Sequence, residues 1–309
     1  MNSGGSPSLL ARLAPFGFVL LWSSSFIGAR AGLRFLSPLA FVAIRQCLCA
    51  LVLLALMLGL RRSFAPLAGR WQHCAIAGAL INGVMLMAAH WGMVRVGAAP
   101  MALVQTLHPL LTALAAGPLL GEWLRLRQWL GLLLGVAGVG LVVGLAAMRS
   151  GAQFDALAVG AAGVLALTTG TIYFSRFCRD LPLLPGAAVQ FLAAAAVCVA
   201  ATVTFETPRA EWTATAFAAI GWNAGVTSLG GMALYFYMLK HGSAARTTAN
   251  FYLMPGVTAV MAWLLLGERL SLLAVAGLAT ASIGCWLVAS RPADGRGGVA
   301  VPAAGRRLG

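Results

Sequence analysis

Ten long apolar stretches, separated by short polar connections that contain Pro or Gly, cover most of the chain. Each is about 20 residues long, the length that an α-helix needs to cross about 30 Å of hydrocarbon. Very few charged residues interrupt them. The pattern predicts ten transmembrane helices, at residues 15–34, 39–60, 73–94, 98–119, 127–147, 156–178, 185–205, 214–238, 244–266 and 271–290.

The two ends of the chain differ from this pattern. Residues 1–14 are small and polar, and residues 291–309 are rich in Gly, Ala and Arg. Neither end holds enough apolar side chains to offset the entropy of ordering it. Both ends are therefore predicted to be disordered, the second as a basic tail.

One stretch of the sequence occurs twice at a constant offset of 146 residues. Residues 105–142 and 251–288 are identical at 16 of 38 positions without a gap. Leucines match by chance in so apolar a chain, so the Pro, Thr, Gly and Glu identities carry the argument for a duplication. The signature residues are Pro109, Gly121 and Glu122 in the first copy and Pro255, Gly267 and Glu268 in the second.

The duplication divides the chain into two five-helix units, residues 15–147 and 156–290. Five is an odd number, so the second unit must enter the membrane in the opposite direction to the first. Inverted repeats are typical of transporters that bind substrate near the bilayer midplane, between the repeats. The predicted fold class is an all-α integral membrane protein with ten transmembrane helices, arranged as two inverted five-helix repeats.

Composition and charge indicate that the chain lies in a membrane and how it is oriented there. The chain is 61% hydrophobic and 9% charged, with mean hydropathy +0.90, which leaves too little charge for the surface of a soluble protein. Its net charge of +14 lies mostly between the apolar stretches, so it indicates topology and not a nucleic-acid partner. With the N-terminus in the cytoplasm, inner segments hold 14 Lys and Arg and outer segments hold 6. A bacterial inner-membrane protein with both termini cytoplasmic is expected.

These features together resemble the drug/metabolite transporter superfamily, and in particular its EamA-type ten-helix transporters. The resemblance covers about residues 15–290 and rests on the repeated Leu-Gly-Glu, the Gly-rich last helix of each half, Leu-Trp-Ser-Ser-Ser-Phe at 21–26, and Pro38 followed by Arg45. It implies secondary transport, often outward, of small metabolites such as amino acids. It does not name the cargo, because one fold serves many functions.

Polar side chains inside the apolar stretches are the candidate substrate pathway. Their structural alternative is hydrogen bonding to a helix carbonyl or to a neighbouring helix. Paired polar patches in the first and sixth stretches, at the 146-residue offset, strengthen the pathway interpretation. The candidates are Trp22, Ser24, Ser25, Arg45, Asn82, His90, His108, Thr169, Tyr173, Tyr235 and Asn250.

The ionisable candidates have two interpretations each. Arg45 either snorkels to the outer interface or pairs with a substrate carboxylate or an internal acid. A buried histidine either packs through hydrogen bonds or carries a proton. Glu122 and Glu268 either gate or relay protons, or lie near the start of the next helix, where the dipole favours a carboxylate. In the second case Gly121 and Gly267 supply the break before that helix.

Pro109 and Pro255 lie at equivalent places in the fourth and ninth stretches. A proline inside a helix leaves a backbone carbonyl without its partner. Both helices are expected to kink around the site, where the freed carbonyl faces protein or a cavity.

No catalytic motif was found: H-E-x-x-H, G-x-S-x-G and G-x-x-x-x-G-K are all absent. No enzyme activity, metal or cofactor is therefore expected, and the partners are a small-molecule substrate and the lipid bilayer. The leading function is an exporter of small neutral or zwitterionic metabolites, such as amino acids, that works by alternating access as a monomer or homodimer. The alternatives are a cationic-drug efflux protein, a sugar-phosphate carrier, and a non-transporting membrane enzyme or sensor.

Overall fold

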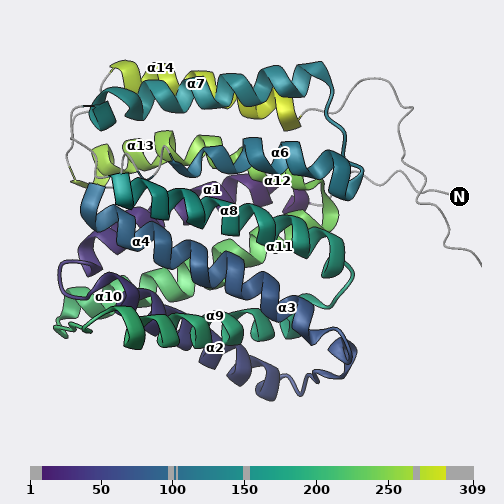
Figure 1. Ribbon diagram of the computed structural model, residues 1–309, viewed down its shortest axis with the longest axis vertical. Helices are drawn as coiled ribbons and strands as arrows, with labels where there is room; N and C mark the ends of the chain where they lie inside the picture. The colour runs from purple at the N-terminus through teal and green to yellow at the C-terminus, as the bar shows by residue number, and fades with distance from the viewer. Residues whose placement is uncertain (1–8, 97–100, 102–103, 149–153, 267–271, 290–309) are drawn as a thin grey trace, which may run out of the picture.

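The computed structural model describes residues 9–96, 101, 104–148, 154–266 and 272–289. Within these ranges the chain is helical apart from turns and short extended connections, and its β-structure is one isolated bridge between Leu36 and Ala210. The helices run side by side across the molecule, with α7 and α14 along one edge and α2 and α9 along the opposite edge (Figure 1).

The two halves of the chain follow a similar order of main helices, each with one π-helix after its third α-helix. The first half has α1 (Leu9–Gly32), α2 (Pro38–Gly59), the 3-10 turn η1 (Ala65–Leu67), α3 (Trp71–Gly78), the π-helix η2 (Ala79–Val84), α4 (Met85–Val96), α6 (Leu107–Leu120) and α7 (Leu126–Met148). The second half has α8 (Phe154–Phe177), α9 (Leu183–Phe205), α10 (Ala214–Gly221), the π-helix η3 (Trp222–Gly231), α11 (Met232–His241), α12 (Ala244–Ala249), the 3-10 turn η4 (Asn250–Leu253), α13 (Met254–Leu266) and α14 (Leu272–Ala289).

Six helical stretches of the described chain are long and apolar enough to cross a membrane. Large apolar side chains such as Leu58, Phe205 and Leu272 point outward and are exposed. Apolar surface on this scale marks a membrane-facing surface in a helical protein. The six stretches are Arg12–Gly32, Pro38–Gly59, Trp71–Arg95, Asp155–Phe177, Leu183–Phe205 and Ala244–Leu265, and two shorter apolar helices are Leu107–Leu120 and Val275–Val288.

The start of α1 corrects one prediction. Residues 9–14, expected to belong to a disordered end, form the first turns of this helix. Ala14 is already buried in the core, so tertiary packing begins before the predicted start at residue 15. Pro15 is compatible with this because its missing N–H removes only one bond, close to the helix start.

The elements of the two halves correspond at the 146-residue offset. Shifted by 146, α2 becomes 184–205 and α6 becomes 253–266, which match α9 and α13 to within one residue. The same shift places η2 at residues 225–230, which lie within η3. Packing shows the same pairing: α1 contacts η3, α10, α11 and α13, whereas α8 contacts η2, α3, α4 and α6.

The helices α7 and α14 approach each other closely because small residues line their contact. A Cβ on Gly284 would lie 2.5 Å from the carbonyl oxygen of Gly131, and a Cβ on Gly138 would lie 2.7 Å from that of Gly277. Gly277 and Gly284 are the counterparts of Gly131 and Gly138 at the 146-residue offset. The two helices therefore meet through equivalent positions of the two halves.

Candidate substrate site

Several helices are interrupted where polar side chains gather. The π-helices η2 and η3 interrupt two of them, and η4 interrupts a third, immediately before α13. Pro109 and Pro255 are the third and second residues of α6 and α13, so the expected kinks take the form of breaks directly before these helices. Proline is tolerated in a first turn because no N–H partner exists there. Broken helices of this kind build binding sites in many transporters.

A small cavity lies among α1, α2 and α4. Its volume is ≈ 20 Å³, which is room for about one water molecule. The polar part of its lining includes four residues of the predicted pathway. The lining residues are Trp22, Ser25, Phe26, Ala29, Arg45, Met85, Leu86, Ala89, His90, Met93 and Gln105.

Arg45 is the charged group of this cavity, and it is only 1% exposed. Its Nε donates to Ser228 Oγ at 2.6 Å, and its Nη1 donates to Asn223 Oδ1 at 3.2 Å. Ser25 Oγ donates to the same Asn223 oxygen at 2.8 Å, and Asn223 Nδ2 is fixed on the carbonyl of Ala219. Arg45 therefore joins the first half to η3 in the second, and it does not snorkel to the surface.

An aromatic cluster adjoins the cavity through Trp22. The Trp22 ring centroid lies 5.4 Å from those of Phe18 and Phe251. Tyr235 stacks on Phe18 at 5.3 Å, and His108 meets Phe251 edge-on at 4.9 Å. The structure thus brings Trp22, His108 and Tyr235 into one aromatic cluster.

His108 and Tyr235 form a second buried polar network. His108 Nδ1 lies 3.0 Å from Thr168 Oγ1 and 3.3 Å from Thr112 Oγ1. Its Nε2 lies 3.4 Å from the Tyr235 hydroxyl, which lies 2.7 Å from Thr171 Oγ1. Both ring nitrogens of His108 therefore have protein partners, which satisfies a buried imidazole.

Two further candidates make hydrogen bonds within or between helices. Ser24 Oγ donates to the carbonyl of Leu21 at 2.7 Å and accepts from Trp222 Nε1 at 3.0 Å. Asn250 Nδ2 donates to the carbonyl of Thr247 at 2.9 Å. These contacts are the structural alternative considered for such groups.

Three candidates lie apart from the cavity. Thr169 is exposed on the outer surface. The Tyr173 hydroxyl lies 2.7 Å from Nδ1 of His73, near one end of the bundle. Asn82 is buried in η2, where its carbonyl accepts from Gln46 and its side-chain amide has no partner.

Asn223 and Ser228, which hold Arg45, are absent from the predicted pathway. Ser228 follows Asn82 by 146 residues, so the repeat contained a signal for it. Asn223 is offset by 146 from Ala77, which is not polar, so the repeat contained none. Only the packing of η3 against α2 identifies it.

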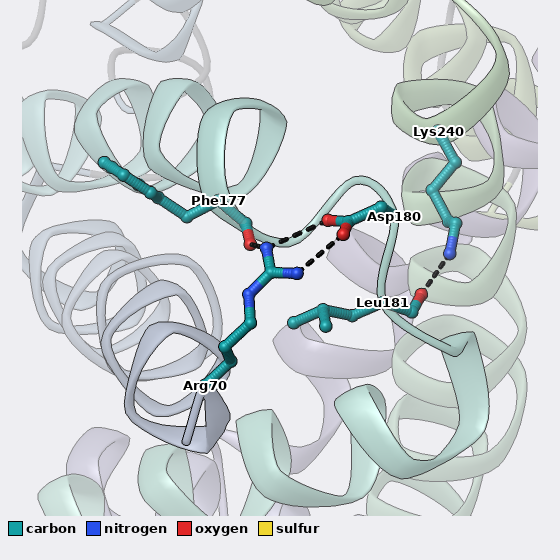
Figure 2. Close-up of polar contacts among 5 residues, drawn as sticks. All are labelled: Arg70, Phe177, Asp180, Leu181 and Lys240. Carbon is teal, nitrogen blue, oxygen red and sulfur yellow. Dashed lines mark hydrogen bonds and ion pairs between the residues drawn. The ribbon is translucent and has the colours of Figure 1, made fainter. Parts of the chain in front are cut away.

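A separate polar cluster joins the halves at one end of the bundle (Figure 2). Arg70, just before α3, donates through Nη1 to Asp180 Oδ2 at 2.6 Å and through Nη2 to Asp180 Oδ1 at 3.0 Å. Its Nη2 also donates to the carbonyl of Phe177 at 2.7 Å, and Lys240 donates to that of Leu181. The hydrogen bond from Arg70 lowers the pKa of Asp180, so this carboxylate stays ionised at neutral pH.

Glu122 belongs to the same end, and its position corrects a prediction. Its carboxylate accepts from the backbone N–H of Ala244 at 2.8 Å, at the start of α12 in the second half and not at the start of α7. Burial raises the pKa of Glu122, and the donated backbone bond opposes this. Gly121 ends α6 with φ 71°, which confirms the predicted break. Gly267 and Glu268 lie outside the described residues.

Comparisons with known proteins agree on one family. Residues 9–144 and 156–290 each match the EamA-like transporter family. The uncharacterized inner membrane transporter YedA of Escherichia coli K12 is 26% identical over 264 residues, which cover 84% of this chain and 83% of that protein. A probable terminal-alkyne amino-acid exporter of Streptantibioticus cattleyicolor is 27% identical over 314 residues, with 94% and 96% covered. One crystal structure has the same fold with a TM-score of 0.75 at 20% identity, over 90% of this chain and 96% of that one.

Proposed function

Because the chain belongs to the EamA-like transporter family and is a multi-pass membrane transporter, we propose that it exports small neutral or zwitterionic metabolites, such as amino acids, by alternating access. The observation that carries this proposal is the cavity that Trp22, Ser25, Arg45 and His90 line, beside the contact of Arg45 with the second half. Such a site offers an aromatic face and a few polar groups, which suits a compact substrate with an apolar part. The amino-acid exporter of Streptantibioticus cattleyicolor supports the direction and the cargo class.

The runner-up cargoes fit this lining less well. An organic cation would need a carboxylate in the cavity, and the described lining has an arginine instead. A sugar phosphate would need paired cations, and among the described lining residues Arg45 is the only Lys or Arg.

The proposed architecture is ten transmembrane helices in two inverted repeats, residues 15–147 and 156–290, that rock against each other. Support comes from the shared order of elements at the 146-residue offset and from the equivalent packing of α1 and α8. The cluster of Arg70, Asp180 and Glu122 would then hold the cytoplasmic end closed, because each of these contacts joins one repeat to the other.

The proposed orientation, with both termini in the cytoplasm, leads to a labelling prediction. Single cysteines at Leu124 and Leu270 in a Cys-free background should react from opposite sides. A membrane-impermeant maleimide added to intact spheroplasts should label position 270 and not position 124. The reason is that the positive-inside rule places residues 119–126 in the cytoplasm. Labelling of both positions from outside would contradict the inverted repeat, and labelling of position 124 alone would reverse the orientation.

Export itself is tested by comparing cells that overexpress the protein with cells that carry the empty vector. We expect one or more amino acids or related zwitterions to accumulate in the medium and to fall inside the overexpressing cells. Metabolite profiling of both compartments measures this without a prior choice of cargo. Identical profiles, with the protein verified in the membrane, would argue against export, and net uptake would reverse the proposed direction.

A further inference from the structure

Arg45 is a buried cation with neutral partners only. It is 1% exposed and donates to a serine hydroxyl and an asparagine carbonyl oxygen, on Ser228 and Asn223. Among the residues that the structure describes, no carboxylate lies within ion-pairing distance of it. A full charge in such surroundings is costly unless a counter-charge joins it, so Arg45 favours a ligand that brings a negative group.

His90, which lines the same cavity, has an unused acceptor. It is 3% exposed, and its Nδ1 lies 2.7 Å from the carbonyl oxygen of Leu86. A carbonyl oxygen can only accept, so Nδ1 carries the proton, and Nε2 of the neutral ring is an acceptor. This Nε2 is buried without any partner in the protein. Buried polar atoms are almost always satisfied, so the orphan Nε2 points to a missing donor.

Two π-helices supply the surroundings of these groups. η3 carries both residues that hold Arg45, and η2 ends directly before Met85 and Leu86, which line the cavity. π-helical segments are rare and occur frequently at functional sites. Their equivalent places in the two halves put one irregular segment from each half beside the cavity.

We propose that Arg45 binds the carboxylate of the transported substrate and that Nε2 of His90 accepts a hydrogen bond from its ammonium group. The site then takes an α-amino acid as its zwitterion, with the apolar side chain against Trp22 and Phe26. A guanidinium can donate two parallel hydrogen bonds to one carboxylate, which makes it a selective partner for that group. This proposal rests on the proposed transport function and names its substrate class.

The arrangement also decides what the site rejects. An amino-acid ester or amide brings a positive charge without a carboxylate, and Arg45 then repels it inside a poorly solvated cavity. A carboxylic acid without an amine satisfies Arg45 but leaves Nε2 of His90 without a donor. Because the cavity of ≈ 20 Å³ has no room for an amino acid, loading must accompany the opening that alternating access supplies.

The experiment uses the purified full-length protein in lipid vesicles. The probes are L-leucine, L-phenylalanine and L-methionine, each with its methyl ester and its deaminated carboxylic acid. Efflux from preloaded vesicles and the thermal unfolding midpoint with each probe are measured for the wild type, Arg45→Met, Arg45→Lys and His90→Phe. Arg34→Met is the matched control, because Arg34 is exposed outside the cavity.

We expect the wild type and Arg34→Met to transport the amino acids and to be stabilised by them. The esters should be neither transported nor stabilising. Arg45→Met should lose at least tenfold in efflux rate while its ligand-free midpoint does not fall, because an uncompensated charge has been removed. Arg45→Lys should be intermediate, and it decides the question if Arg45→Met does not fold. His90→Phe should lose the preference for amino acids over the deaminated acids.

Wild-type efflux rates in both Arg45 variants, or equal efflux of esters and amino acids, would overturn the carboxylate site. The carboxylate site would also be overturned if the wild type transports none of the probes while the overexpressing cells export another metabolite. In that case the proposed exporter function stands. If those cells export nothing, the proposed function fails together with this inference.

Discussion

Replacing Gly78 by leucine should strongly lower the yield of folded transporter and its thermal midpoint. Gly78 ends α3, and a Cβ there would lie 2.3 Å from both the Cα and the carbonyl oxygen of Gln190 in α9. These are backbone atoms, so rotation of a side chain cannot relieve the clash. Helix α9 of the second half must therefore move away from α3. Overpacking of this kind costs about 1–3 kcal/mol or more, a large fraction of the stability of an ordinary domain. The measurement is the monodisperse fraction and the thermal midpoint after purification.

Gly221→Leu is the matched control for this change. Gly221 ends α10, has helical dihedral angles, and meets no atom within 4 Å of an added Cβ. The two substitutions have the same chemistry and similar helix propensity, so they differ in the packing that they disturb. Equal yields and midpoints for both variants would mean that α3 and α9 are not in the close contact described above.

The helices of this protein were largely readable from the sequence because their local signals are strong. Apolar runs of the membrane length gave most helix ends to within a few residues, as at α9 and α12 to α13. The start of α1 was predicted too late because residues 1–14 were judged small and polar, whereas packing of Ala14 in the core extends the helix toward Leu9. Local helix propensity does not include the stabilisation that comes from this packing.

Part of the site followed from the sequence, and part did not. Trp22, Ser25, Arg45 and His90 were visible as polar or aromatic groups in apolar surroundings, and they line one cavity. The contacts of Arg45 with Asn223 and Ser228 were not, because they depend on how η3 packs against α1 and α2 in the folded protein. The same holds for the partner of Glu122: its distance along the chain to α12 is 122 residues, and only the assembled halves bring them together.

Oxidation of the native protein should stop transport completely and reversibly. The thiols of Cys74 and Cys178 line the same small cavity, near the end of the bundle that Arg70 and Asp180 occupy. Cys74 lies in α3 of the first half, and Cys178 directly follows α8 of the second. A disulfide between them would therefore tie the halves together where the proposed mechanism requires them to part.

The size of the effect follows from disulfide geometry. A disulfide holds its two Cα atoms within about 7 Å, so the linked end cannot open far enough to pass a metabolite. The membrane-permeant oxidant diamide, added to vesicles that contain the wild type, should abolish efflux of whichever metabolite the cells export, and dithiothreitol should restore it. Cys74→Ser should transport with and without diamide, and mass spectrometry of the Cys74–Cys178 peptide reports the extent of the bond. Full transport by quantitatively cross-linked protein would show that α3 and α8 keep their contact through the cycle, and the proposed rocking of the two halves would have to be replaced by movement of fewer helices.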